Sequence, residues 1–242
     1  MNNKMAVIIT MAGEGSRFKK AGYQEPKYMI KAKNKTLFDW ALASLVGYNN
    51  HVEKYVFVVK KEDHAENFIR EHCQRYNIKN IQIVEIDNLT DGQATTCMLA
   101  LPYCNPDSGI MIYNIDTYVE PGELKYEAIS GAGHIPCFHA DGDHWSFVKL
   151  DNHGNAIEVR EKSRISDNCT LGAYYFSSAM LYKKLYEEYY ADNYHMEKNE
   201  KYIAPLYNLM IEKHMPVTIS IIDRHKIHVL GTPEELKQFL NQ

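Results

Sequence analysis

The sequence predicts an α/β protein: a single domain with a mostly parallel central sheet, helices on both faces of the sheet, and antiparallel strands added at its edge. Up to residue 116, short and almost continuously apolar segments alternate with segments whose apolar residues recur at helical spacing. This alternation is typical of parallel sheets that helices cover on both sides. After residue 116 the strand-like segments mix polar and apolar residues, which favours antiparallel strands.

The first half is expected to alternate strands with helices. Strands are predicted at residues 6–10 (AVIIT), 54–59 (KYVFVV), 81–86 (IQIVEI) and 109–115 (GIMIYNI). Helices are predicted between them at residues 36–45, 61–76 and 93–103. In the first of these helices, Thr36 and Asp39 have the spacing of a capping box.

The second half is expected to extend the same sheet. Strand-like segments occupy residues 134–140, 144–151, 155–161 and 170–176, followed by helices at 178–190 and 202–214. Two more strands are predicted at 217–223 and 226–230, and a final helix begins in GTPEELKQFL at Gly231. Because the second half builds on the first, we expect one domain over residues 1–242.

Composition limits the classes of function. The chain has 45% hydrophobic and 24% charged residues, a net charge of −4, and no basic stripe, which argues against a nucleic-acid partner. Neither a signal peptide nor an apolar run of the ~20 residues that cross a bilayer is recognisable, so no membrane partner is expected. The five cysteines contain no CxxC pair and are expected to be reduced, in the cytoplasm.

A phosphate-binding loop is predicted just after the first strand. Gly13 and Gly15 lack Cβ atoms, so the backbone can bring its N–H groups close to a phosphate. Ser16 adds a hydroxyl, Arg17 a planar fork of donors, and Lys27 a compact positive charge. Each feature alone is also typical of an ordinary turn, and the loop matches neither the P-loop nor the dinucleotide fingerprint.

The order AGEGSRF, Pro26-Lys27 and KTLF resembles the signature of the nucleotidylyltransferases that act on sugar phosphates and related small phosphates. That family has a GT-A-like, Rossmann-type fold. Many members carry alanine or glycine where this chain has Met11. The resemblance implies that residues 1–116 form a nucleotide-binding half and residues 117–242 a second-substrate half. It implies a nucleotide-binding loop made of Met11, Ala12, Gly13, Gly15 and Ser16.

Further segments resemble the same family along nearly the whole chain. LTDGQATT resembles the segment that closes over base and ribose, with Gly92 and Gln93 at the contacting positions. VREKS supplies Glu161 and Lys162, similar to the pair that meets the second substrate, and Gly172 corresponds to a corner of that pocket. GTPEEL at residues 231–236 resembles the closing segment.

The resemblance also implies a divalent cation, Mg²⁺ or alternatively Mn²⁺, bound by carboxylates. Asp116 ends the fourth strand, where the family holds its metal aspartate, although a strand-ending aspartate is also a common turn former. Many relatives have a second aspartate two residues before the glycine of the Gly-Thr motif, where this chain has Val229. Asp223 is a candidate replacement across a hairpin, or only a turn residue, and Asp116 with extra waters is the other alternative.

The implied reaction transfers a nucleoside monophosphate from a nucleoside triphosphate to a substrate phosphate and releases pyrophosphate. Because the substrate brings its own oxyanion, positive charge and positioning supply the catalysis. Arg17 and Lys27 are assigned to the triphosphate, and Lys162 to the attacking phosphate. The alternatives are a GT-A glycosyltransferase that uses a nucleotide sugar and a non-catalytic nucleotide-binding regulator.

The identity of the substrates is less constrained. The short chain and a possible base contact from Gln93 favour CTP, as in cytidylyltransferases of capsule or surface-polymer biosynthesis. The expected acceptor is a sugar phosphate, phosphocholine or a phosphoglutamine-like precursor. The histidines at 134, 139 and 144 have a spacing that suits neither a helix face nor a strand, so zinc is not expected. The oligomeric state stays open.

Overall fold

The computed structural model describes residues 4–192, 195–197 and 199–242. The strands are β1 (Met5–Thr10), β2 (Lys31–Ala32), β3 (Lys35–Thr36), β4 (Val52–Lys60), β5 (Ile81–Ile86), β6 (Ile110–Asn114), β7 (Thr117–Val119), β8 (Gly133–His139), β9 (Ser146–Leu150), β10 (Ala156–Glu161), β11 (Asn168–Thr170), β12 (Ala173–Phe176), β13 (Val217–Ile221) and β14 (Ile227–Val229). The α-helices are α1 (Ser16–Lys20), α2 (Leu37–Ser44), α3 (Glu66–Arg75), α4 (Gln93–Met98), α5 (Ala179–Tyr189), α6 (Leu206–Glu212) and α7 (Pro233–Leu240).

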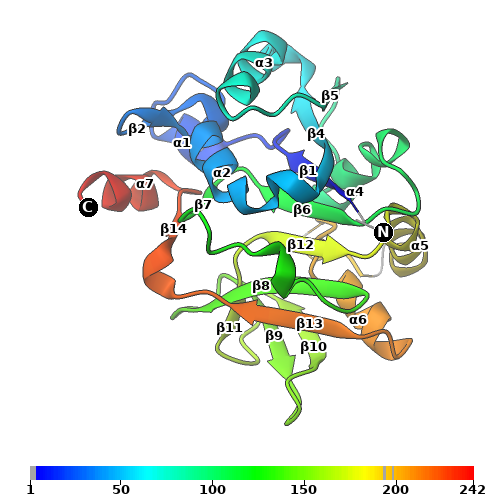
Figure 1. Ribbon diagram of the computed structural model, residues 1–242. Coiled ribbons are helices and arrows are strands. Elements are labelled where there is room, and N and C mark those ends of the chain that lie inside the picture. Colours follow the sequence, from blue (N-terminus) through cyan, green and yellow to red (C-terminus); the bar gives the residue numbers. More distant parts are fainter. Residues whose placement is uncertain (1–3, 193–194, 198) are drawn as a thin grey trace.

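One large sheet organises the molecule, with strand order β10-β9-β11-β8-β12-β6-β1-β4-β5 and β13 paired to β8. The strands of the first half, β6, β1, β4 and β5, are all parallel to one another. The antiparallel strands of the second half join this group at β6, through β12. Figure 1 shows the two groups one above the other, with the blue to green parallel strands above and the yellow-green and orange strands below. The predicted fold class is therefore confirmed.

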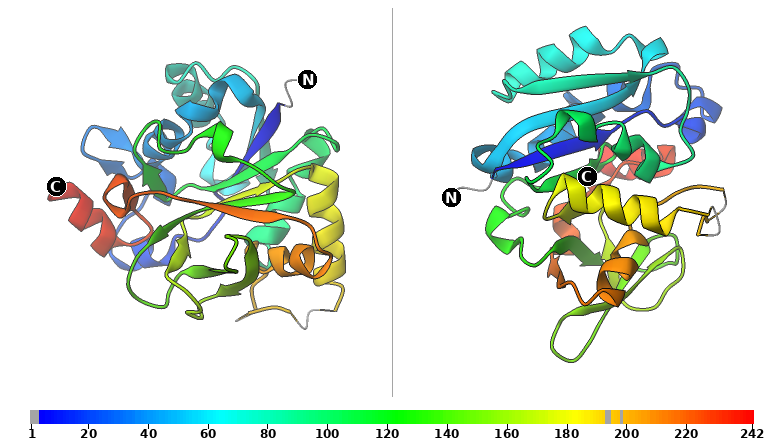
Figure 2. Two further views of the ribbon diagram at one scale, coloured as in Figure 1. Left: turned by 60° about the horizontal axis from the view of Figure 1, so that its bottom comes forward. Right: turned by 90° about the vertical axis from the view of Figure 1, so that its right-hand side faces the viewer.

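Helices cover both faces of the sheet because the strand residues alternate between the faces. In β1, Val7 and Ile9 belong to a core cluster that contains residues of α2 and α3. Ala6 and Ile8 point the other way, into a cluster with residues of α4, α5 and α6. The two views of Figure 2 show the yellow α5 beside the orange α6 on this second face.

Helix α2 has the capping box that the sequence predicts. The Thr36 hydroxyl accepts a hydrogen bond from the Asp39 backbone N–H, and Asp39 Oδ2 accepts one from the Thr36 backbone N–H at 3.0 Å. The predicted helix at residues 93–103 is shorter than expected. It ends as α4 at Met98, and a separate 3-10 turn follows from Leu101 to Tyr103, where Pro102 lacks the N–H that would continue an α-helix.

The second half differs from the sequence prediction in two places. The segment 170–176 is not one strand, because Gly172 has a positive φ of 85° and breaks it into β11 and β12. The last two predicted strands do not form a hairpin. Strand β13 pairs in parallel with β8, and β14 pairs with β7 in a separate small sheet.

The C-terminal helix α7 packs against the first half of the chain. A third core cluster joins Phe18 of α1, Leu37 of α2 and Leu236 and Phe239 of α7. The Leu230 N–H donates to the Asp116 carbonyl oxygen at 2.7 Å, which places the segment before α7 beside the end of β6. Among the helices of the described residues, none is long and apolar enough to cross a bilayer.

Candidate functional site

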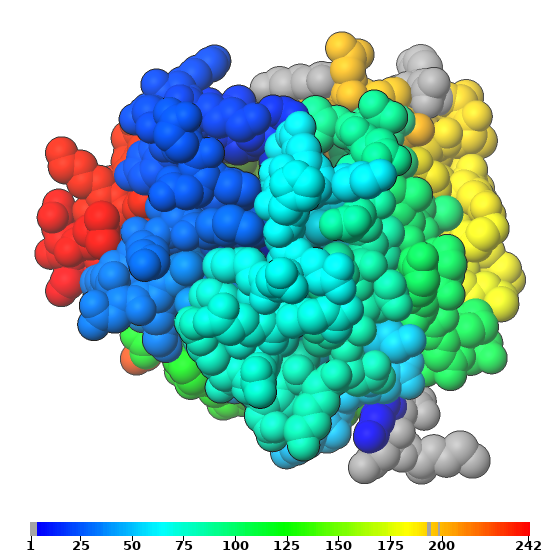
Figure 3. Space-filling model, turned by 90° about the horizontal axis from the view of Figure 1, so that it is seen from above, coloured from blue at the N-terminus to red at the C-terminus, as the bar shows by residue number. Residues whose placement is uncertain are grey.

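A cleft with a volume of about 800 Å³ lies at the carboxyl end of the parallel strands. It is bordered by residues that directly follow β1, β4 and β6, and by the segment before α4. Carboxyl ends of parallel strands meet at one edge of a sheet, so these loops converge although they are far apart in the sequence. In Figure 3 the blue N-terminal segments lie beside the cyan and green segments that follow β4 and β5.

The loop after β1 brings the predicted nucleotide-binding residues to this cleft. Met11, Ala12, Gly13 and Gly15 line it, and the Met11 N–H is fixed to the Val58 carbonyl oxygen of β4 at 2.9 Å. Gly15 has a φ of 62°, the left-handed conformation that glycine adopts most readily, and it begins α1. Ser16 and Arg17 follow on α1 with exposed side chains and do not border the cleft.

Lys27 and Asp116 meet in the cleft from opposite sides. Lys27 Nζ lies 2.7 Å from Asp116 Oδ2, and each side chain is 23% exposed. Burial by itself would raise the pKa of Asp116, but the charge and the hydrogen bond of Lys27 outweigh it, with a further contribution from Arg17. The pKa of Asp116 is therefore lowered, and its carboxylate is ionised and paired before any ligand arrives.

Gln93 is connected to Gly172 through Asn114, a residue that the sequence prediction did not include. Gln93 Nε2 donates to Asn114 Oδ1 at 2.5 Å and to Thr10 Oγ1 at 2.9 Å. A Cβ at position 172 would lie 2.4 Å from Asn114 Nδ2, so only glycine leaves space for this amide. Gln93 and Gly92 line the cleft, whereas Gly172 lies behind Asn114.

Glu161 and Lys162 lie apart from the cleft lining, at the end of β10. Lys162 Nζ donates to the Tyr202 hydroxyl at 2.6 Å, and this hydroxyl also interacts with Glu200 on the cleft rim. Lys162 has a φ of 50°, a strained conformation for a non-glycine residue. Burial raises the pKa of Glu161, against the opposing effects of the Ser146 hydroxyl and Lys162.

The structure does not bring Asp223 to the cleft. Asp223 is exposed and accepts a hydrogen bond from the His225 N–H at 2.9 Å, as the cap of a 3-10 turn. Since β13 and β14 do not pair, the described strands form no hairpin that would carry Asp223 toward Asp116, and Asp223 takes the turn position that the sequence analysis gave as the alternative. No group of three or more His, Cys, Asp or Glu among the described residues could hold a metal ion.

Two further cleft residues were missed by the sequence analysis. Lys60, the last residue of β4, is nearly buried, and its Nζ lies 2.7 Å from Glu62 Oε1 and 3.5 Å from Asp63 Oδ1. Tyr28 lies beside them and donates to Asp63 Oδ2 at 2.9 Å. For Lys60, as for Asn114, the sequence did contain a signal: each is the last residue of a parallel strand and so lies at the ligand-binding edge of the sheet.

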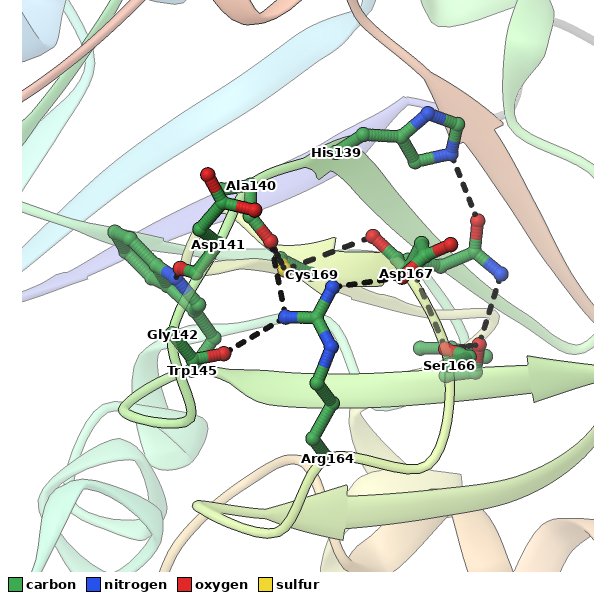
Figure 4. A network of polar contacts seen from close by, with 11 residues as sticks. His139, Ala140, Asp141, Gly142, Trp145, Arg164, Ser166, Asp167 and Cys169 are labelled. Atoms are coloured by element: carbon green, nitrogen blue, oxygen red, sulfur yellow. Dashed lines mark hydrogen bonds and ion pairs between the residues drawn. The ribbon is translucent and has the colours of Figure 1, made fainter.

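A second hollow, of about 970 Å³, lies between the β8–β9 connection, β14 and α7. Figure 4 shows that Arg164, which borders it, is already engaged by protein groups. Its guanidinium donates to the carbonyl oxygens of Ala140 and Gly142 at 3.0 and 2.7 Å and pairs with Asp167 at 2.7 Å. Arg164 therefore fixes a loop, and the cleft beside β1 and β6 remains the better candidate for chemistry.

Several solved structures are similar to this chain over nearly its whole length. The nucleoside-diphosphate-sugar pyrophosphorylase from Vibrio cholerae RC9 is similar with a TM-score of 0.90 and 35% identity, covering 98% of this chain and 100% of that chain. The inositol-1-phosphate CTP transferase from T. maritima has a TM-score of 0.77 at 14% identity, covering 99% of this chain and 96% of that chain. HddC from Yersinia pseudotuberculosis has a TM-score of 0.67 at 15% identity, covering 98% of each chain. No protein-family model and no curated protein matches the chain.

The fold and the 35% identical relative define the class of protein, which is a nucleotidyltransferase. More narrowly, the chain belongs to the sugar-phosphate nucleotidylyltransferase family. The two remote structures, both below 25% identity, add support for the fold alone.

Proposed function

We propose that the protein transfers a nucleoside monophosphate from a nucleoside triphosphate to a sugar phosphate and releases pyrophosphate. The observation that supports this most is the meeting of the glycine loop, Lys27 and Asp116 in one cleft at the carboxyl edge of the sheet. The Vibrio cholerae relative, described as a nucleoside-diphosphate-sugar pyrophosphorylase, makes sugar phosphates the first acceptor class to test. Phosphocholine and phosphoglutamine-like acceptors are the next classes.

The triphosphate is proposed to bind along the loop after β1. The backbone of Gly13 and Gly15 can approach phosphate oxygens, because no Cβ stands in the way. Arg17 is exposed at the start of α1, where it can turn toward the outer phosphates. Lys27 lies deeper, beside Asp116, and is assigned to the α-phosphate, where negative charge increases in the transition state.

The cation is proposed to be Mg²⁺ or Mn²⁺, held by Asp116 and by phosphate oxygens. Asp116 fits this role, because its carboxylate is ionised and lies at the cleft beside the cations that would hold the triphosphate. A divalent ion there would neutralise phosphate charge and keep several waters. Lys27 can exchange its contact with the Asp116 carboxylate for a contact with a substrate phosphate, because the carboxylate and the phosphate are both oxyanions with similar hydrogen-bonding capacity.

The acceptor is proposed to enter from the side of the second half. Lys162 would attract its phosphate, and Glu161 its hydroxyl groups. The contact of Lys162 with Tyr202, and of Tyr202 with Glu200, connects this region to the cleft rim.

CTP is proposed as the preferred triphosphate, with Gln93 near the base. Gln93 Nε2 already donates to Thr10 and Asn114, so its carbonyl oxygen is the group left to accept a hydrogen bond from a base amino group. Such an acceptor suits cytosine, which has an amino group, better than uracil, which has none. A role in capsule or surface-polymer biosynthesis is part of the same proposal.

The test is pyrophosphate release from CTP, UTP, GTP, ATP and dTTP, each with Mg²⁺ and a panel of sugar 1-phosphates. We expect release that needs both a triphosphate and a phosphorylated acceptor, and that is fastest with CTP. Release with another triphosphate would overturn only the base preference. Absence of release with every pair, together with no nucleotide binding in calorimetry, would overturn the proposed function.

A further inference from the structure

Among the described residues, one buried carboxylate oxygen has no partner; it belongs to Glu235, which borders the second hollow rather than the cleft. Within the described part of the chain, Glu235 Oε2 is the buried side-chain oxygen or nitrogen atom that lacks a hydrogen bond. An unsatisfied buried carboxylate oxygen is costly, because it has lost its hydrogen bonds to water without gaining others. Such an atom calls for a ligand that the protein alone does not provide.

Glu235 lies close to Asp116, and both carboxylates lie beside the Cβ position of Gly231. A Cβ at position 231 would be 3.0 Å from Asp116 Oδ2 and 3.5 Å from Glu235 Oε2. The two oxygens are therefore at most about 6.5 Å apart, the sum of these two distances. A side chain at position 231 would fill the space between the carboxylates, and glycine leaves it open.

The start of α7 explains why Glu235 is placed there. Thr232 caps the helix and accepts a hydrogen bond from the Glu235 N–H at 3.1 Å. In a complete capping box the acidic side chain would return to the cap backbone, as Asp39 does at the start of α2. Glu235 Oε2 does not make that bond, and its oxygen is left for another group.

Val229 supplies no such oxygen. Val229 pairs with Thr117, the residue directly after Asp116, in the β7–β14 sheet. Its side chain is apolar, however, and packs against the core cluster that contains Val7 and Ile9. The position at which many relatives carry the second aspartate is therefore unable to bind a cation here. Glu235 Oε2 and Asp116 Oδ2 instead lie beside the same Cβ position of Gly231.

We propose that Glu235 is the second carboxylate of a divalent-cation site with Asp116, and that it replaces the aspartate missing at Val229. Two oxygens that bind one Mg²⁺ directly are at most about 4.2 Å apart, and a metal-bound water extends that reach. The oxygens of Glu235 and Asp116 can reach a shared ion with a small rotation or through one water, provided that the ion displaces Lys27 from Asp116 Oδ2. Lys27 and Arg17 are the cations facing Asp116, and neither accounts for the free oxygen of Glu235. The inference rests on the proposed function for the role of the ion.

The experiment measures Mn²⁺ binding to the full chain without nucleotide, by electron paramagnetic resonance of the free ion. Glu235→Gln keeps the shape and hydrogen-bonding groups of the side chain but removes its charge. We expect this variant to bind Mn²⁺ at least about tenfold more weakly, the usual scale for losing a group that supports a metal. Asp116→Asn is expected to lose binding to at least the same extent.

Glu234→Gln is the matched control, because Glu234 is exposed in the same helical turn and carries the same charge. It should retain the Mn²⁺ affinity of the unmodified protein. Circular dichroism melting of all variants confirms that each one is folded. Loss of affinity in Glu234→Gln equal to that in Glu235→Gln would show a general charge effect and overturn the assignment.

The failures of the two proposals are distinguishable. Mn²⁺ affinity that is unchanged in Glu235→Gln but lost in Asp116→Asn overturns the role of Glu235 and leaves the nucleotidyl transfer intact. The role of Glu235 is also overturned if the unmodified protein binds no Mn²⁺. If Mn²⁺ binding depends on both carboxylates but no triphosphate is turned over, the cation site stands and the proposed function fails.

Discussion

The parallel and antiparallel halves of the sheet use their polar residues in opposite ways. In the parallel half, Lys60 and Asp116 lie at strand ends and Lys27 lies in the connection after β1, and all three line a shared cleft. In the antiparallel half, His134 and Arg164 are satisfied by neighbouring strands and loop carbonyls. The difference teaches that burial of polar groups marks a ligand site only where the strand ends converge, since elsewhere the same groups hold the fold together.

The largest expected effect comes from removing a cation of the parallel half. Lys27→Ala and Arg17→Ala should each lower the rate of pyrophosphate release by about 10²–10³, as loss of a single charge-stabilising donor typically does. Lys20→Ala, an exposed position on the same helix as Arg17, should leave the rate unchanged. Steady-state kinetics with melting curves provide the check, and near-normal turnover in Lys27→Ala would remove that residue from the mechanism.

The joint between the two halves is tested next. Gly172→Ala should lower the free energy of unfolding by about 2–3 kcal/mol, because it adds a strained φ and a Cβ that collides with Asn114. Gly154→Ala isolates the first effect, because Gly154 has a φ of 84° and no atom within 4 Å of its Cβ position. Gly154→Ala should lower the free energy of unfolding by about 1 kcal/mol. Equal losses in urea unfolding would show that Asn114 moves aside freely.

A pH effect is expected from the antiparallel half. Burial lowers the pKa of His134 to about 4 from its ordinary 6.5, so the folded protein keeps this side chain neutral while the unfolded chain takes up a proton. The folded state therefore loses stability as pH falls below 6.5, by about 2 kcal/mol at pH 5 from this group. Between pH 7 and 5, His134→Gln should lose less stability than the unmodified protein, as measured by urea unfolding.

His139→Gln serves as its control, because His139 is exposed on the same strand. This variant should retain the pH dependence of the unmodified protein. If His134→Gln shows the same pH dependence as the unmodified protein, then His134 takes up its proton in the folded state and the proposed burial effect is absent.

The smallest effect is expected at the acceptor side. Lys162→Met should raise the KM for the sugar phosphate about tenfold, or about 1.4 kcal/mol, and leave the KM for the triphosphate near its original value. Lys149→Met, at an exposed position of β9, should change neither constant. A rise in the KM for the triphosphate alone would place Lys162 with the nucleotide and erase the proposed division between the halves.

The sequence by itself determined the parallel half. Strands β1, β4 and β6 lie close to the predicted ranges, because a strand buried on both faces is recognisable as a continuous apolar run, and the edge strand β5, though only partly buried, also matches its prediction. The cap of α2 was also predictable, since Thr36 and Asp39 interact within one helical turn. The rule that parallel strands share one ligand-binding edge pointed to the loop after β1 as the site, whereas the assignment of Asp116 to that site came from the family resemblance.

Only the tertiary structure decided how the second half is assembled and which groups stand beside Asp116. β13 pairs with β8 across more than seventy residues, and nothing local in either segment specifies that partner. Glu235 in the sequence is an ordinary helix-capping residue, and its nearness to Asp116 arises because α7 packs on α1 and α2. Short-range patterns report local hydrogen bonding and burial, whereas the neighbours of a charged group depend on contacts between distant segments.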